Sequence, residues 1–239
     1  MIKVEGLTKA FGGNKVLDGV SLEVAAGEVV ALMGLSGTGK SVLLLHIVGL
    51  MSPDAGKIIV DGDPVTELSE SRLLLFRRKV GYLFQDSALY DFMTVGENLA
   101  FPLKEHTRLK PVDIRAKVDA HLKMVDLAGS ADTFPSELSG GMRKRAALAR
   151  ALIMNVKVLL CDEPTSGLDP IRSRDISQLI RDLSKKAGCA TVVTTHDMLN
   201  AFRIADRAFV LNQGKLAAQG TETEVRGSSD PFVKEFLAG

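Results

Sequence analysis

The stretch Glu28–Ser41, EVVALMGLSGTGKS, decides the fold class. Its first six residues predict a short buried strand, and residues 34–41 fit the pattern G-x-x-x-x-G-K-[ST]. Glycines let successive backbone N–H groups curl around an anion, and a helix predicted from about Lys40 to Leu50 adds its positive end. The pattern therefore predicts a phosphate-binding loop, in which Lys40 reaches the β- and γ-phosphates and the Ser41 hydroxyl binds Mg²⁺.

A second segment, Val158–Glu163 (VLLCDE), supplies the carboxylates that such a site needs. An apolar strand carries Asp162 to the edge of a sheet, where it could hold Mg²⁺ through water. Glu163, one residue further, could polarise an attacking water. An Asp-Glu pair after a strand is also common as an ordinary acidic turn. The segment therefore indicates a catalytic site only in combination with the phosphate loop.

Strands and helices alternate in the second half of the chain, over Val156–Asp162, Pro170–Lys186, Ala190–Thr195 and Met198–Ala205. This alternation predicts α/β architecture with a mainly parallel core sheet. The first 30 residues read as β-rich, residues 68–138 as mostly helical, and residues 209–217 as a closing hairpin.

Composition restricts the class of protein. The chain has 239 residues, of which 46% are apolar and 25% charged, the proportions of a globular protein. The net charge of +1 argues against a general nucleic-acid binder, and no apolar run approaches the roughly 20 residues of a membrane-spanning helix. Two cysteines without metal-site spacing are consistent with a reduced, cytoplasmic protein.

Residues 138–142, LSGGM, make the pattern specific. They follow the phosphate loop and precede DEP at 162–164, SGLD at 166–169 and THD at 195–197. This ordered set, which spans almost the whole chain, resembles the ATPase subunit of ABC transporters. The resemblance implies ATP hydrolysis with ATP and Mg²⁺ as cofactors. It also implies a single domain over 1–239, with an N-terminal antiparallel β subdomain, a mainly parallel core sheet and a helical subdomain inserted at about 86–155.

The resemblance also implies roles for individual residues. Phe11 would stack on adenine, Gln85 would touch both Mg²⁺ and the membrane subunit, and Glu163 would be the general base. His196 would sense the γ-phosphate, and Asp169 would belong to a loop that couples two sites. The expected catalytic residues are Glu163, His196 and Gln85. The expected metal ligands are Ser41, Gln85 and Asp162. The expected nucleotide contacts are Phe11, Gly34, Leu35, Ser36, Gly37, Thr38, Gly39, Lys40, Ser41, Ser139, Gly140, Gly141 and Asp169.

The LSGGM segment also has a physical interpretation. Ser139 can cap a helix that runs to about Leu152, and two glycines admit close backbone approach. Arg143, Lys144 and Arg145 place three cations in the first turn, where the helix dipole disfavours them. An anion delivered to that end would relieve the conflict, and in the family it is the γ-phosphate held by another subunit. The alternative is that Lys144 and Arg145 belong to a solvated basic face.

One phosphate loop and one LSGG segment occur in the chain. In the family a complete site pairs the loop of one copy with the signature of another. Two copies must therefore meet, and the partner is expected to be a second copy of this chain.

The stretch Tyr82–His106, together with LSGGM in place of LSGGQ, is similar to the ATPases of MCE-type phospholipid transport, which maintain outer-membrane lipid asymmetry in Gram-negative bacteria. This similarity implies a multispanning membrane permease and an MCE-domain protein as partners, and a peripheral position on the cytoplasmic face of the inner membrane. Those relatives carry a longer C-terminal extension than this chain, so the similarity does not carry over any dimer contact or accessory-protein docking that such an extension makes. Importers of amino acids or metal chelates share much of the Gln85 region and are the alternative.

Non-transport ABC ATPases fit less well. A ribosome-acting protein would carry two such domains, and a chromosome-structuring ATPase would insert a long coiled coil. A GTP-binding switch protein would lack LSGG.

The segment after Gln85 is rich in large apolar side chains, namely Leu89, Tyr90, Phe92 and Met93. They predict an exposed apolar surface that binds the permease. The alternative is that these side chains pack against the helical subdomain.

Overall fold

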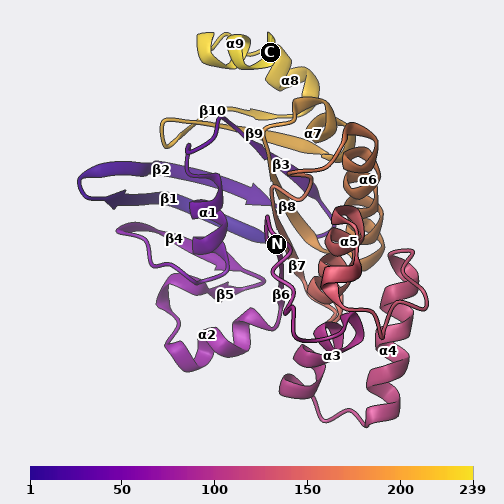
Figure 1. Cartoon of the computed structure of the whole chain (residues 1–239). Coiled ribbons are helices and arrows are strands. Elements are labelled where there is room, and N and C mark those ends of the chain that lie inside the picture. The colour runs from indigo at the N-terminus through magenta and orange to yellow at the C-terminus, as the bar shows by residue number, and fades with distance from the viewer. Residues whose placement is uncertain (239) are drawn as a thin grey trace.

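A twisted sheet of six strands forms the centre of the molecule in Figure 1. The computed structural model of the chain describes residues 1–238. The strand order is β10-β9-β3-β8-β7-β6; all neighbours are parallel except the hairpin β9–β10. The strands are β3 (Val29–Met33), β6 (Val80–Leu83), β7 (Val158–Asp162), β8 (Ala190–Thr195), β9 (Arg207–Asn212) and β10 (Lys215–Gly220). Every residue of β3, β7 and β8 is buried, as expected for strands covered on both faces.

A second sheet is antiparallel, with the order β2-β1-β4-β5. Its strands are β1 (Ile2–Phe11), β2 (Asn14–Val24), β4 (Ala55–Val60) and β5 (Asp63–Pro64). Val20, Leu22 and Val24 of β2 are buried at alternate positions, so one face of this sheet points to the core. The predicted α/β class, with an antiparallel N-terminal part and a mainly parallel core sheet, is confirmed.

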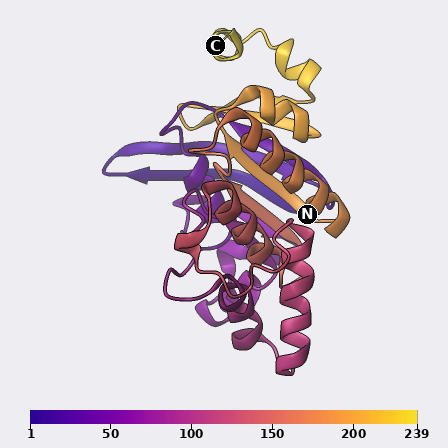
Figure 2. The ribbon, with the colours of Figure 1, turned by 45° about the vertical axis from the view of Figure 1, so that its right-hand side comes forward.

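Helices cover both faces of the core sheet. They are α1 (Lys40–Ile47), α2 (Glu70–Arg77), α3 (Val95–His106), α4 (Pro111–Met124), α5 (Gly140–Leu152), α6 (Pro170–Ala187), α7 (Met198–Ile204), α8 (Glu222–Arg226) and α9 (Pro231–Ala238), with 3-10 turns at Val65–Glu67 and Pro135–Glu137. On one face, α1 packs between the core sheet and the antiparallel sheet. On the other, α3 to α6 share a core with β7. Figures 1 and 2 show α3 and α4 projecting from the end of the molecule opposite the C-terminal helices.

One sequence prediction needs an addition and another a correction. Residues 68–138 are mostly helical, as predicted, but the strand β6 lies within them and pairs in parallel with β7. A Cβ on Gly81 would lie 2.4 Å from the carbonyl oxygen of Ala151, so glycine allows α5 to pack closely on this strand. The first helix ends at Ile47 instead of Leu50, because Gly49 adopts a left-handed φ of 69°. The C-terminal helices α8 and α9 were not predicted.

The carboxyl ends of the central strands meet at one edge of the core sheet. Met33 at the end of β3 pairs with Thr195 of β8, and Asp162 at the end of β7 pairs with Thr194. Ligands of open α/β sheets bind outside this edge. The register therefore brings three segments that are far apart in the sequence to one place. Among residues 1–238, no helix combines the length and the apolar character needed to cross a bilayer.

Candidate functional site

The loop between β3 and α1 has a conformation that requires glycine. Gly34 has a φ of 152°, and a Cβ there would lie 2.4 Å from the Leu211 carbonyl oxygen. Gly39 has a φ of 100°, and its Cβ would lie 2.8 Å from the Val16 carbonyl oxygen. Gly39 also precedes α1 without any side-chain cap, so the N–H groups of the first turn are available to an anion.

Lys40 is folded back over this loop. Its side chain is only 6% exposed, and its Nζ donates to the carbonyl oxygens of Gly34 and Leu35 at 2.9 and 3.0 Å. The same Nζ lies 3.5 Å from Oε1 of Glu163. A buried cation is thereby held directly above a loop of backbone N–H groups, an arrangement suited to a polyphosphate.

Asp162 is the centre of a network of hydroxyl groups. Its Oδ1 accepts from Ser41 Oγ at 2.9 Å and from Thr194 Oγ1 at 2.7 Å, and its Oδ2 accepts from the Tyr82 hydroxyl at 3.3 Å. Burial, followed by the Asp162 charge, raises the pKa of Tyr82, which keeps this hydroxyl a donor. Thr194 and Tyr82 were not among the predicted site residues. The only signal for Thr194 was its position just before Thr195-His196.

Glu163 is held between two nitrogen groups. Its Oε2 lies 3.0 Å from Nδ1 of His196, and its Oε1 faces the Lys40 amine. The Glu163 backbone has a positive φ of 44°, and its N–H donates to Thr194 Oγ1 at 2.9 Å. Strained backbone of this kind is concentrated at functional sites. It turns the carboxylate away from β7 and towards the phosphate loop.

These groups open onto one cavity of about 570 Å³. It is lined by Phe11, Val16, Ser36, Gly37, Gly39, Lys40, Ser41, Val42, Gln85, Glu163, Ser166 and His196. Nine of the predicted site residues are in this set, although they come from five separate segments. Phe11 is 46% exposed at the rim, which leaves its ring available for stacking. Gln85 Nε2 donates to Ser166 Oγ at 3.4 Å.

The LSGGM segment lies elsewhere. Ser139 and Gly141 line a separate cavity of about 240 Å³, which shares no residue with the first. Ser139 caps α5 by accepting from the Met142 N–H at 3.4 Å, as predicted. Asp169 caps α6 by accepting from the N–H groups of Ile171 and Arg172, and these bonds lower its pKa. Within one chain the structure does not bring these residues to the phosphate loop.

The three cations at the start of α5 already have partners. Arg143 donates to the Leu138 carbonyl at 2.8 Å, and Arg145 pairs with Asp126 Oδ2 at 2.7 Å. Lys144 is 5% exposed and donates to the carbonyl oxygen of Gln85, and burial lowers its pKa. The interpretation of Lys144 as part of a solvated basic face is therefore wrong. It ties α5 to the segment that contains Gln85.

A strand, a glycine-rich loop, a buried lysine and an adjacent Asp-Glu pair together define the class of phosphate-binding-loop nucleoside triphosphatases. A family profile described as "ABC transporter" matches residues 17–166. The chain belongs to this family, as an ATP-binding subunit that hydrolyses ATP.

Several relatives align with the whole chain. It is 44% identical to the probable ribonucleotide transport ATP-binding protein mkl of Mycobacterium leprae, covering 69% of that protein. Other mycobacterial mkl proteins are covered over 66% of their length, so the chain spans about two thirds of these relatives. It is 41% identical to the intermembrane phospholipid transport system ATP-binding protein MlaF of Escherichia coli, covering 89% of it, and 39% identical to that of Haemophilus influenzae, covering 90%.

Solved structures agree with the fold. The ATP-binding cassette MJ0796, in a dimeric post-hydrolysis state bound to ADP and Pi, superposes with a TM-score of 0.84 at 34% identity. The match covers 92% of this chain and 98% of that one. CbiO1 from Clostridium perfringens, part of the transporter complex cbiONQ, gives a TM-score of 0.87 at 32% identity. It covers 99% of this chain and 94% of the other.

Substitution of Lys40 by Ala is expected to weaken ATP binding by about 10-fold or more, because it removes a buried charge-assisted donor to phosphate. Isothermal titration with ATP measures the effect, and circular dichroism verifies that the variant is folded. Lys57→Ala is the control, since the Lys57 side chain is 67% exposed on β4. Unchanged ATP affinity in a folded Lys40→Ala protein would contradict the assignment of this loop as the phosphate-binding segment.

Proposed function

We propose that this chain powers a transporter that moves phospholipids between the inner and outer membranes, from the cytoplasmic face of the inner membrane. The observation that best supports ATP hydrolysis is the position of the Glu163 carboxylate, which lies between Lys40 and His196 beside the phosphate loop. The substrate rests on the MlaF relatives, which are phospholipid transport proteins by name and match the chain over its full length. The mkl relatives are named for ribonucleotide transport, so a ribonucleotide is the second candidate.

The residues present also fit Mg²⁺ bound together with nucleotide. Ser41 Oγ and the Asp162 carboxylate are hard oxygen donors 2.9 Å apart, and Gln85 lines the same cavity. Among residues 1–238, no group of three His, Cys, Asp or Glu side chains could hold a metal by itself. Mg²⁺ commonly binds through one or two protein oxygens plus substrate phosphates. In this proposal Ser41, Asp162 and Gln85 would hold the ion, which would shield phosphate charge.

The remaining groups act on ATP and water. Phe11 stacks on the adenine, and Lys40 with the N–H groups of the loop holds the β- and γ-phosphates. Glu163 accepts the proton of the attacking water through a carboxylate oxygen. His196, bonded to Glu163, orients this carboxylate and contacts the γ-phosphate.

Two copies of the chain complete the site. Gly140 and Gly141 do not need to be glycine for packing inside the chain, because added Cβ atoms would meet neighbours at ordinary distances of 3.5 and 3.7 Å. A close approach from outside explains them better. We therefore place the signature cavity of one copy, with Ser139, against the nucleotide of the other, and Asp169 beside the contact. The dimers of MJ0796 are consistent with this arrangement.

Substitution of Glu163 by Gln should preserve ATP binding and lower turnover by about 10²-fold or more, because an amide cannot accept the proton. Unhydrolysed ATP should then remain bound between two copies of the chain and stabilise the dimer. Sedimentation of the variant with and without ATP is expected to show a shift from monomer to dimer. Turnover close to that of the wild type would contradict Glu163 as the general base and favour His196. A dimer that forms equally with and without ATP would exclude control of dimerisation by nucleotide.

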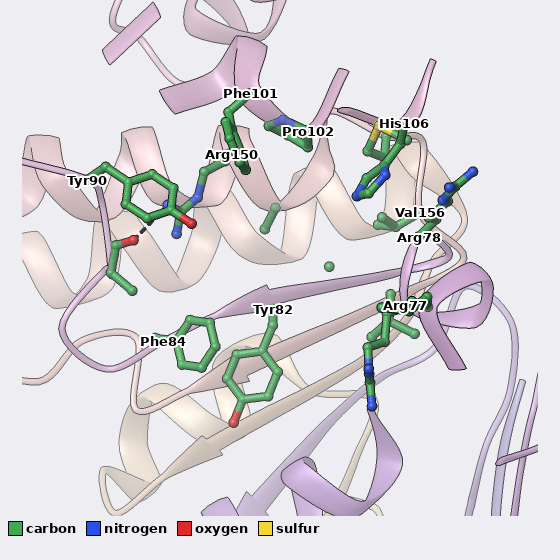
Figure 3. A pocket seen from close by; sticks show the side chains of 16 residues that line it. Arg77, Arg78, Tyr82, Phe84, Tyr90, Phe101, Pro102, His106, Arg150 and Val156 are labelled. Carbon is green, nitrogen blue, oxygen red and sulfur yellow. Dashed lines mark hydrogen bonds between the residues drawn. The ribbon is translucent and has the colours of Figure 1, made fainter. Parts of the chain in front are cut away.

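A cavity of about 550 Å³, here called the edge groove, lies beside β6. Its lining residues are Leu74, Arg77, Arg78, Val80, Gly81, Tyr82, Phe84, Ala88, Tyr90, Phe101, Pro102, His106, Arg150, Ala151, Met154 and Val156 (Figure 3). Tyr90 belongs to it, but Phe92 and Met93 do not; Phe92 is 76% exposed beside Tyr90. Of the side chains predicted to form an exposed apolar surface after Gln85, Tyr90 and Phe92 are exposed, and the groove lies next to them.

The edge groove has the chemistry of a docking site for a membrane subunit. It combines aromatic rings with three arginines, and no Asp or Glu is present among its described lining residues. Arg150 donates to the carbonyl oxygens of Ala88 and Ser87, so the loop after Gln85 is fixed to α5. We propose that a cytoplasmic helix of the permease, apolar with carboxylates, binds here. An MCE-domain protein would complete the complex.

Introduction of a carboxylate in the groove, by Phe101→Glu, should abolish co-purification with the permease of the proposed transporter. A buried charge in an apolar contact is costly, while basal ATPase activity of the isolated subunit should persist. Val112→Glu is the matched control, because Val112 is 70% exposed on α4 and outside the groove. Co-purification of Phe101→Glu at the wild-type level would exclude this surface.

The transported substrate can be decided with the complete complex in proteoliposomes. ATP is expected to drive transfer of labelled phospholipid to acceptor vesicles, and Glu163→Gln should stop it. The same vesicles loaded with labelled ribonucleotide test the second candidate. Ribonucleotide movement without lipid transfer would overturn the phospholipid proposal and leave the ATPase assignment intact.

A further inference from the structure

Tyr82 reaches two places at once. Its ring lines the edge groove, with its centroid 4.2 Å from that of Phe84. Its hydroxyl donates to Asp162 Oδ2 at 3.3 Å, on the nucleotide side of the sheet. Figure 3 shows the hydroxyl pointing away from Tyr90, Phe101 and Pro102, which form the other side of the groove. A single rigid side chain therefore connects the groove with the carboxylate.

The bond from Tyr82 is the one that fixes the second oxygen of Asp162. Oδ1 already accepts from Ser41 and Thr194, whereas Tyr82 is the side chain that donates to Oδ2. A carboxylate bonded at both oxygens has its plane fixed, and groups that orient a metal ligand in this way control its affinity for the metal. Without this donor the carboxylate could rotate about its side-chain bonds.

We propose that Tyr82 is a positioning residue that orients Asp162 and transmits occupancy of the edge groove to it. This inference rests on the proposed function, in which Asp162 serves Mg²⁺ and a partner fills the groove. A phenol ring is rigid, so a displacement of its groove face moves the hydroxyl by a similar amount. The hydrogen bond to Asp162 weakens steeply with poorer geometry. A segment bound in the groove thereby changes how readily Mg²⁺ is held with ATP.

The chain offers a matched control for Tyr82, because Tyr82 and Tyr90 are its only two tyrosines. Both rings line the groove, and only the Tyr82 hydroxyl is bonded to Asp162. Phenylalanine keeps the ring and removes the hydroxyl. Binding of the non-hydrolysable analogue AMP-PNP should therefore require about 10-fold more Mg²⁺ for half-saturation in Tyr82→Phe than in wild type or Tyr90→Phe. Binding measured in EDTA should be equal in all three proteins.

Fluorescence gives a readout independent of binding and turnover. The chain contains no tryptophan, so Tyr82 is the single phenol emitter of the Tyr90→Phe variant and can be excited above the absorption of phenylalanine. Emission from a phenol is sensitive to hydrogen bonding with a carboxylate. Addition of Mg²⁺ with AMP-PNP is expected to change the emission of Tyr90→Phe beyond the change with AMP-PNP alone. Tyr82→Phe, which reports only Tyr90, should show no such metal-dependent step.

Filling the groove tests the transmission. Cys161 and Cys189 are fully buried, so N-ethylmaleimide will label a cysteine introduced at an exposed position. Labelling Phe101→Cys places a group in the groove, and labelling Val112→Cys places one outside it. In the Tyr90→Phe background, the first label should alter Tyr82 emission and shift the half-saturating Mg²⁺ concentration by about 3-fold or more. The second should do neither.

The outcomes separate this inference from the proposed function. Equal Mg²⁺ dependence of Tyr82→Phe and Tyr90→Phe would overturn the role of Tyr82, while nucleotide binding in wild type would still support the ATPase assignment. An effect of Tyr82→Phe without an effect of the Phe101→Cys label would retain the positioning of Asp162 and overturn transmission from the groove. Failure of wild type to bind AMP-PNP with Mg²⁺ would instead contradict the proposed function.

Discussion

The parallel register of three buried strands is the constraint on which the site depends. Because β7 and β8 pair Asp162 with Thr194, one hydroxyl can donate to the Asp162 carboxylate and accept from the Glu163 N–H. A register shift of one residue would turn these side chains to the opposite face of the sheet. The fully buried strands β3, β7 and β8 resist such a shift, since each of their side chains has a place in a packed core.

The same architecture keeps the phosphate loop and the LSGGM segment apart within one chain. The phosphate loop follows β3, whereas the signature follows the helical segment that packs on the other face of the sheet. Their cavities have no residue in common. Association of two copies would join complementary halves, and the γ-phosphate would be a contact that neither copy has alone. A bond between chains that disappears on hydrolysis gives ATP turnover a mechanical consequence.

The short strand β6 borders two cavities, since its residues line the edge groove and Gln85, just after it, lines the cavity of the phosphate loop. Gly81 allows α5 to pack against it, Tyr82 donates to Asp162, and Gln85 follows it into the nucleotide cavity. Lys144 and Arg150 of α5 hold the carbonyl groups of the next residues. The edge groove and the cavity of the phosphate loop are thus connected through one strand and one helix, as the proposed transmission between them requires.

Local motifs could be predicted from the sequence because each of them consists of residues that are close together in the chain. The phosphate loop needs its glycines and Lys40 within eight positions, and α5 begins where Ser139 can cap it. Hence the α/β class, the loop and the Asp-Glu pair could be predicted. The tertiary structure decided what depends on distant segments: the strand β6 with only four residues, the burial of Lys144, and the edge groove that excludes Phe92. It also decided that Thr194 and Tyr82 reach Asp162, because hydroxyl groups have no sequence signal until a sheet register brings them to a carboxylate.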